Sequence, residues 1–137
     1  MNTFTICGQK IVEGTANGEA LVSNEPISFI GGLDPLTGIV TEPGHQLEGQ
    51  CVAGKILVYP TGKGSTGGSY RIYEMAYRKT SPAAIILADR ESVVVLGCIM
   101  GNIPAVDHFE QDPCQVIHNG DYVYVDGTTG LVRVERK

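Results

Sequence analysis

Residues 61–69 combine the residue types needed to bind a small anion and to move a proton. The segment reads T-G-K-G-S-T-G-G-S and lies between an apolar run, 55–59, and a stretch with helical periodicity, 69–79. Glycines let the backbone approach a ligand, and the start of a helix leaves amide N–H groups unpaired beside the positive end of the helix dipole. The segment therefore predicts an anion site, with Lys63 as its mobile cation.

The hydroxyl residues of this segment also have a structural explanation. Ser65, Thr66 or Ser69 could cap the helix that follows, because a serine or threonine oxygen accepts a hydrogen bond from the first amide groups of a helix. For Ser69, capping or packing is the preferred interpretation. Ser65 lies further out in the loop, and the pattern alone leaves both roles open for it.

Two familiar motifs do not fit the chain. A Walker A loop requires G-x-x-x-x-G-K followed directly by Ser or Thr, whereas Gly64 separates Lys63 from Ser65. The chain has no G-x-S-x-G elbow, so a Ser–His–Asp triad is poorly supported. The histidines fall in unrelated loops, where we interpret each as a surface or structural residue: His45, His108 and His118.

A second candidate lies in the turn 31–38, which reads G-G-L-D-P-L-T-G. Pro35 and Gly38 stand where a turn favours proline and glycine. Asp34 could face a partner or a substrate there, and a plain turn residue explains it equally well.

The elements that must position the loop form a β–loop–α–β unit within a β-rich chain. Residues 55–59 and 83–88 are continuous apolar runs, typical of strands buried on both faces. The helix between them places Ile72 and Tyr73 on one face, and the connection implies parallel strands. Further strands are predicted over 4–13, 19–23, 39–41, 103–106, 122–125 and 131–135, a second helix over 91–100, and a turn over 15–18.

The composition fits one compact domain spanning residues 1–137, with 42% hydrophobic and 18% charged residues. A net charge of −5 and scattered basic residues argue against nucleic acid as a partner. No apolar run reaches the roughly 18 residues that cross a bilayer, and no secretory signal is visible. We therefore expect a cytoplasmic protein that binds neither membrane nor nucleic acid.

The four cysteines never form a C-x-x-C pair: Cys7, Cys51, Cys98 and Cys114. In a cytoplasmic chain we expect four reduced and mostly buried thiols, because free cysteine is often an interior residue. No metal site is predicted in this chain. An iron–sulfur cluster, if the function requires one, must be held by another chain.

The mixture of antiparallel strands from both ends with a central parallel unit resembles the swivelling β/β/α domain. That fold is known in the aconitase swivel domain and in the phosphohistidine domain of phosphoenolpyruvate-dependent enzymes. A phosphocarrier would need a histidine at the start of the central helix, where this chain has S-T-G-G-S. The segment 97–106 echoes those carriers, which we interpret as shared fold without shared activity.

Three stretches together resemble the small subunit of the aconitase X family: residues 18–38, with G-E-A-L-V, E-P-I-S-F and G-G-L-D-P-L-T-G; residues 62–70, G-K-G-S-T-G-G-S-Y; and residues 82–86, P-A-A-I-I. The resemblance spans nearly the whole chain. It implies a β-rich α/β fold, the swivelling β/β/α domain of aconitase. It also implies a hydro-lyase of two subunits, in which a large subunit carries an iron–sulfur cluster and this chain alone is inactive.

By its place in G-K-G-S-T, the family's catalytic serine maps onto Ser65. Removing water from a β-hydroxy acid needs a base for the α-proton and a Lewis acid for the departing hydroxyl. Cluster iron of the large subunit would take the hydroxyl. Backbone amides and Lys63 would stabilise the serine alkoxide and lower its pKa. The implied substrate-binding residues are Lys63, Gly64, Thr66, Gly67 and Ser69.

The form of the loop, with Lys63 and Tyr70, is nearer to family members that dehydrate (R)-5-phosphomevalonate to trans-anhydromevalonate 5-phosphate. The alternative within the family is dehydration of cis-3-hydroxy-L-proline, whose enzymes tend toward G-R-G-S-S-S. The alternative outside it is a non-catalytic swivel module that binds an anion or carries phosphate.

Overall fold

The computed structural model describes residues 2–63 and 67–136. Its elements in chain order are β1 (Asn2–Cys7), β2 (Gln9–Val12), β3 (Thr15–Val22), β4 (Ile56–Tyr59), α1 (Gly67–Arg78), β5 (Ala84–Leu87), α2 (Ser92–Gly101), β6 (Ala105–Asp107), α3 (Pro113–Val116), β7 (Tyr122–Asp126) and β8 (Leu131–Arg136). No helix in these described ranges is long and apolar enough to cross a membrane.

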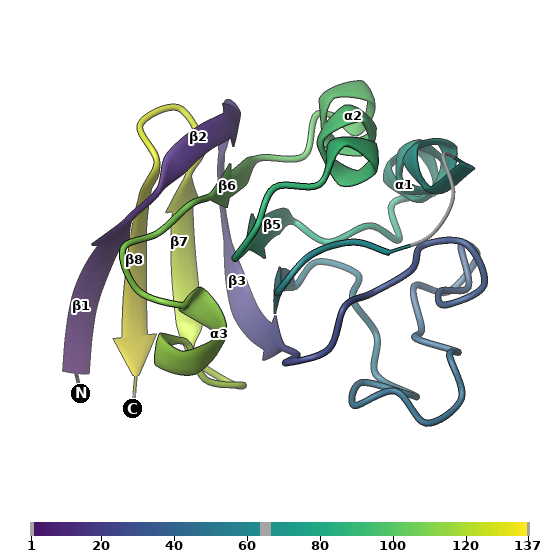
Figure 1. Ribbon diagram of the computed structural model, residues 1–137, viewed down its shortest axis with the longest axis horizontal. Helices are drawn as coiled ribbons and strands as arrows, with labels where there is room; N and C mark the ends of the chain where they lie inside the picture. The colour runs from purple at the N-terminus through teal and green to yellow at the C-terminus, as the bar shows by residue number, and fades with distance from the viewer. Residues whose placement is uncertain (1, 64–66, 137) are drawn as a thin grey trace.

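The strands form one mixed sheet in the order β1-β8-β7-β3-β4-β5-β6-β2. The pairs β1–β8, β8–β7 and β7–β3 are antiparallel, whereas β3, β4, β5 and β6 run parallel to one another. At the far edge β2 pairs antiparallel with β6. Figure 1 shows the antiparallel strands at one side of the molecule and α1 and α2 side by side at the other. Both predicted buried strands and their parallel pairing are confirmed.

The two edges of the sheet belong to one stretch of chain, because Gly8 alone separates β1 from β2. A Cβ atom at Gly8 would lie 2.5 Å from the carbonyl oxygen of Asp107 and 2.7 Å from a methyl of Val106. The Gly8 N–H donates to the carbonyl oxygen of Gly130 at 2.9 Å. Glycine therefore lets the chain pass from β1, which pairs with β8, to β2, which pairs with β6, and the sheet closes on itself.

The strands β4 and β5 divide the apolar interior into two cores. On one face Leu57, Tyr59 and Leu87 pack with the inner sides of α1 and α2. On the other, Val58 and Ile86 pack with residues of the antiparallel strands. Alternate residues of a strand point to opposite faces, so a continuous apolar run is what burial on both faces demands.

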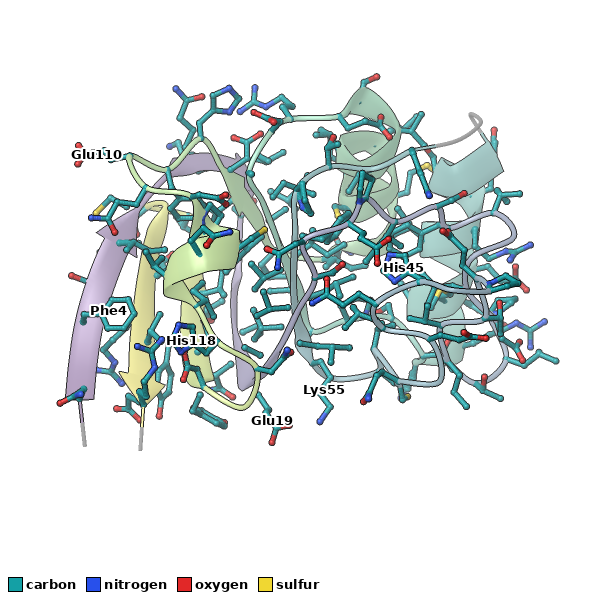
Figure 2. The ribbon with its side chains drawn as sticks, turned by 60° about the horizontal axis from the view of Figure 1, so that its bottom comes forward. Phe4, Glu19, His45, Lys55, Glu110 and His118 are labelled. Atoms are coloured by element: carbon teal, nitrogen blue, oxygen red, sulfur yellow. The ribbon has the colours of Figure 1, made fainter. Side chains whose placement is uncertain are left out.

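Residues 23–55 join β3 to β4 without regular strands or helices in this described segment. The segment packs against the helices through its apolar residues, which belong to the core on the helical side: Ile27, Phe29, Leu33, Val40, Leu47 and Val52. The buried His45 lies among its turns (Figure 2). The His45 ring bonds the Pro26 carbonyl oxygen and accepts from the Leu47 N–H, both at 3.0 Å, so this histidine is structural.

Three local predictions were wrong. The turn over 15–18 is part of β3, where Ala16 and Gly18 pair with β7. A Cβ at Gly18 would lie 2.8 Å from the Gly54 carbonyl oxygen, so this glycine serves a close approach of two chain segments. In place of the strand expected over 39–41, Ile39 and Val40 each make an isolated bridge. Tyr73 is half-exposed, because α1 turns Ile72 and Met75 toward the core.

The helices α1 and α2 touch closely because α2 presents glycines to α1. A Cβ atom at Gly97 would lie 2.8 Å from both Cβ and Cδ1 of Ile72. We expect Gly97→Ala to lower the free energy of unfolding by about 1–3 kcal/mol, since the added methyl overpacks this contact. Urea denaturation measures the loss.

The double variant Gly97→Ala/Ile72→Ala is the control. Ile72→Ala removes the Cδ1 and Cγ2 atoms, which would lie 2.8 and 3.2 Å from the new methyl, and keeps only the Cβ contact, so the double variant should lose less than the two single losses added together. Additive losses would contradict the contact as the cause.

Asp121 ties the end of β8 to the segment that precedes β7. The Arg136 guanidinium donates to both Asp121 carboxylate oxygens, at 3.0 and 2.7 Å, and the His118 N–H donates at 2.8 Å. Arg136 also lies over the Phe4 ring, on the side of the molecule where Figure 2 shows Phe4 and His118. Burial raises the pKa of Asp121, but the hydrogen bonds from Arg136 and His118 outweigh it and hold the pKa below the ordinary value.

Because the folded pKa of Asp121 is lowered, its stabilisation is complete above the unfolded pKa of about 3.9 and disappears as pH falls through the folded value. We expect Asp121→Asn to cost about 2 kcal/mol at pH 7, with a smaller difference from wild type at pH 3. Urea unfolding at both pH values measures this.

The control is Glu19→Gln. Glu19 forms an exposed ion pair with Lys55 at 3.2 Å (Figure 2), and exposed pairs contribute less than about 1 kcal/mol. An Asp121→Asn loss that is equal at pH 7 and pH 3 would contradict the role of its charge.

Candidate functional site

The candidate site lies where the parallel strands end. β4 leads into residues 60–63 and then α1, β5 leads to Arg90, Glu91 and α2, and β6 ends at Asp107. The carboxyl ends of neighbouring parallel strands meet at one edge of a sheet, which is the usual ligand edge of such sheets. The topology therefore brings the predicted anion loop together with polar residues from two other connections.

The first part of the loop is anchored to the 23–55 segment. The Ile27 N–H donates to the Thr61 carbonyl oxygen at 3.3 Å, and the Lys63 N–H donates to the Ile27 carbonyl oxygen at 3.1 Å. Ile27 itself is buried in the core. The backbone that precedes the glycine-rich stretch is therefore fixed to a packed residue.

Gly62 lets the loop pass against the start of α2. A Cβ atom there would lie 2.6 Å from Glu91 Oε1 and 2.6 Å from a methyl of Val94. The other Glu91 oxygen, Oε2, accepts from the Val93 N–H and caps α2. One carboxylate thus contacts the loop and supplies the cap of the second helix.

Tyr59 is the last residue of β4, three positions before Gly62. Its side chain is fully buried, and its hydroxyl has no hydrogen-bond partner among the described residues. Burial, with smaller contributions from Cys98 and Glu91, raises the pKa of Tyr59 well above its ordinary value. The hydroxyl therefore stays protonated at physiological pH.

Lys63 offers a positive charge at the surface of the site. Its ammonium lies 3.0 Å from Glu42 Oε2, and its side chain is half-exposed. Exposed ion pairs are weak, so an anionic ligand can replace Glu42 as the partner of Lys63 at small cost. The predicted role of Lys63 as a mobile cation fits this geometry and stays a prediction.

Ser69 connects the two helices. Its hydroxyl donates to the Val93 carbonyl oxygen at 2.6 Å, and the residue is 2% exposed. A Cβ atom at the neighbouring Gly68 would lie 3.1 Å from a Val93 methyl, so the helices are close at this point. The structure gives Ser69 the packing role that was the preferred interpretation of its pattern, and its contact with substrate stays a prediction.

Three of the predicted site residues, Gly64, Ser65 and Thr66, lie outside the described residues. Gly67, the fourth candidate for an amide donor, is the first residue of α1. The assignments of catalysis to Ser65 and of substrate binding to this set therefore stay predictions.

Asp34 shapes the 31–38 turn. Its Oδ1 accepts from the Leu36 N–H at 2.9 Å, and its carbonyl oxygen accepts from the Gly38 N–H at 2.8 Å. The turn is fastened to α1 by Arg71, which donates to the Leu33 carbonyl oxygen at 3.1 Å. The plain turn interpretation accounts for every described contact of this carboxylate, and contact with a partner or substrate stays a prediction.

Sequence reasoning named only His108 at this edge, as a surface or structural residue, and missed the cluster that it forms with Arg90 and Asp107. Arg90 donates to both oxygens of the buried Asp107, at 2.9 and 3.1 Å, and His108 Nδ1 lies 2.9 Å from Asp107 Oδ1. His108 adopts a left-handed backbone with φ of 54°. The sequence contained a signal for Arg90 and Asp107, because each follows a predicted strand, 83–88 or 103–106. Polar residues that follow neighbouring parallel strands lie at the same edge of the sheet.

The cysteines lie in separate elements. Cys98 and Cys114 are buried, whereas Cys7 and Cys51 are exposed, so the expectation of mostly buried thiols holds for two of the four. Burial raises the pKa of Cys98 to about 12, and burial together with Asp112 raises that of Cys114 to about 12. The part of the chain described here has no group of three or more metal-ligating side chains, so these residues do not fit an iron–sulfur cluster.

These features together describe a swivelling β/β/α domain with a glycine-rich loop at the carboxyl edge of its parallel strands. Residues 5–134 match the family described as the aconitase X swivel domain. The chain is also similar to the Thermococcus kodakaraensis aconitase X in its holo-form crystal structure. The TM-score is 0.92, with 44% identity and coverage of 97% of this chain and 99% of that chain.

Two named relatives are similar over nearly their whole length. A phosphomevalonate dehydratase small subunit from Methanococcoides burtonii is 47% identical over 134 residues, covering 98% of each chain. One from Methanocella arvoryzae is 49% identical over 129 residues, covering 94% of this chain and 98% of that protein. The chain belongs to the aconitase X swivel domain family, and the predicted family and fold class are confirmed.

The contact between Gly62 and the Glu91 cap can be tested directly. We expect Gly62→Ala to lower the free energy of unfolding by about 1–3 kcal/mol, because its methyl would overlap Glu91 and Val94. We also expect faster amide hydrogen exchange at Val93 as the cap loosens. Exchange monitored by NMR measures this.

Thr61→Ala, one residue earlier, is the matched control. It should change the free energy of unfolding by less than about 0.5 kcal/mol and leave amide exchange at Val93 as in wild type. The double variant Gly62→Ala/Val94→Ala should recover part of the stability by opening space. Wild-type stability and exchange in Gly62→Ala would show that the close approach is unimportant.

Proposed function

We propose that this chain is the small subunit of a phosphomevalonate dehydratase, a two-subunit hydro-lyase. The proposal rests on one observation above all: relatives carrying that name are 47% and 49% identical across nearly the entire chain. The substrate would be (R)-5-phosphomevalonate and the product trans-anhydromevalonate 5-phosphate. We place the enzyme in the cytoplasm.

Ser65 would accept the α-proton of the substrate. It follows Lys63 and Gly64 in the stretch that leads to the start of α1. A serine oxygen is a very weak base in water, so it needs surroundings that stabilise its anion. The positive end of the α1 dipole, amides of Gly64, Thr66 and Gly67, and the Lys63 ammonium are the groups of this chain that would do so.

Lys63 would also bind an anionic group of the substrate. Phosphomevalonate carries a phosphate and a carboxylate, and either would compete with Glu42 for the ammonium group. The anchoring of the Lys63 backbone to Ile27 supports this role, since it fixes where the flexible side chain begins. Ser69 would act mainly by holding α1 against α2, so that the amides at the start of α1 keep their direction.

The large subunit of the aconitase X enzyme would supply what this chain lacks. We propose that it holds the iron–sulfur cluster, because the described cysteines of this chain lie apart in β1, the 23–55 segment, α2 and α3. The small subunit would then cover the substrate, and it would be inactive alone. No step of the proposed reaction on this chain requires a metal ligand from it.

The test is co-expression of this chain with an aconitase X large subunit, anaerobic reconstitution, and assays of dehydration with phosphomevalonate and with cis-3-hydroxy-L-proline. We expect turnover of phosphomevalonate and at least about a 100-fold lower kcat in Ser65→Ala, since a general base contributes about 100- to 10,000-fold. The complex should still assemble.

Ser81→Ala is the matched control, because Ser81 lies before β5 at the opposite edge of the parallel strands. It should keep wild-type activity. Undiminished turnover in Ser65→Ala would remove the serine base and leave a structural lid. Turnover of cis-3-hydroxy-L-proline alone would reassign the substrate, and binding of an anion by this chain without any large subunit would favour a stand-alone module.

A further inference from the structure

The helix α2 is apolar on all sides. It reads S-V-V-V-L-G-C-I-M-G and contains no charged residue. Its inner side, with Val94 and Cys98, is buried, while Leu96 and Ile99 on the outer side are 51% and 53% exposed. A helix that is hydrophobic all round is normally covered all round. The outer side of α2 therefore requires a neighbour that these residues of the chain do not provide.

The neighbouring helix α1 adds a row of tyrosines. Tyr70, Tyr73 and Tyr77 are 71%, 46% and 81% exposed, and their spacing of three and four residues places them along one side of the helix. The two helices are side by side (Figure 1), with Gly97 against Ile72. We call Tyr70, Tyr73, Tyr77, Leu96 and Ile99 together the α1/α2 outer face.

The size of this face suits a stable complex. The exposed parts of the tyrosines correspond to roughly 300–500 Å², given about 150–250 Å² for a whole aromatic side chain. Leu96 and Ile99 add to this area. A stable interface buries about 800 Å² on each partner, and an exposed apolar patch of more than a few hundred Å² usually marks a binding surface. Five side chains thus supply about half of a standard interface.

The charges on α1 do not oppose docking. Glu74 pairs with Arg78 at 2.9 Å and with Arg71 at 3.6 Å, so each charged residue of α1 has an opposite charge beside it, with one positive charge in excess. A partner would therefore leave no single charge buried without an opposite charge. Tyrosine suits such a surface, because its ring is apolar while its hydroxyl can bond to a polar rim.

The face also adjoins the candidate site. α1 begins at Gly67, directly after the glycine-rich loop, and the α2 cap Glu91 approaches Gly62 of the same loop. Both helices thus start at the edge that holds the candidate site, and the α1/α2 outer face extends from this edge along the two helices. A protein bound on this face would extend to the loop that the proposed chemistry uses.

We propose that the α1/α2 outer face is where the large subunit docks. This inference rests on the proposed function, which requires such a subunit. A second copy of this chain is the other candidate occupant, but it would bring another small subunit beside the loop and contribute none of the cluster chemistry. The large subunit therefore presents a mainly apolar, uncharged surface to Leu96, Ile99 and the tyrosines.

The test measures the affinity of the full chain for the large subunit by biolayer interferometry, without substrate. We expect Leu96→Lys to weaken binding at least about 30-fold, because it places a charge at the centre of an apolar contact. Leu131→Lys is the matched control. Leu131 is 42% exposed on β8, among the antiparallel strands, and its substitution should change the affinity less than about 3-fold.

Circular dichroism should show Leu96→Lys folded, since the side chain is half-exposed in this chain. Should that variant unfold, Tyr77→Ala decides the question, because Tyr77 is mostly exposed and its loss should weaken binding at least about 10-fold. Wild-type affinity in the folded variants would overturn the proposal.

Two other results separate the inferences. A wild-type chain that dimerises alone in sedimentation experiments, and becomes monomeric with Leu96→Lys, would assign the face to a second copy and overturn the proposal. A wild-type complex that forms, is weakened by Leu96→Lys and yet fails to dehydrate phosphomevalonate would support the docking face and refute the proposed function. Absence of any complex with the large subunit would overturn both.

Discussion

Burial of β4 and β5 on both faces is the constraint on which the rest of this structure depends. Neighbouring strands in which nearly every residue is apolar need cover on two sides, and the chain supplies it by different means. The helices α1 and α2 cover one face together with residues 23–55. The antiparallel strands cover the other, as the sheet curls and closes through Gly8. Parallel pairing then follows from a connection through α1, and it fixes the edge at which both strands end.

The close packing of the helices at that edge positions the glycine-rich loop. Gly62 passes Glu91, the Glu91 carboxylate caps α2, and Ser69 returns a hydrogen bond from α1 to the first turn of α2. Because these contacts share residues, a shift in either helix would move the start of α1. The proposed catalytic serine belongs to the loop between these fixed points, so the precision of its surroundings would come from the two helices.

The same pair of helices connects the candidate site with the exposed α1/α2 outer face. Their first turns lie at the site edge, and their outer sides form the exposed apolar face of α2 and the tyrosine row of α1. A small subunit that covers a substrate held by another chain needs both a loop to place over the substrate and a surface by which to hold that chain. In this domain one structural unit could meet both needs, since α1 and α2 pack against each other through Gly97, Ile72 and Ser69.

Local pattern in the sequence determined the elements around the site and the place of the loop. Apolar runs at 55–59 and 83–88 and helical spacing between them depend on neighbouring residues alone, as does the turn chemistry around Asp34. Only the tertiary structure decided that Gly18 lies in a strand and that the Ser69 hydroxyl donates to the Val93 carbonyl oxygen. Those outcomes depend on which segments far apart in the chain come together, and the periodicity of a single segment carries no information about its distant neighbours.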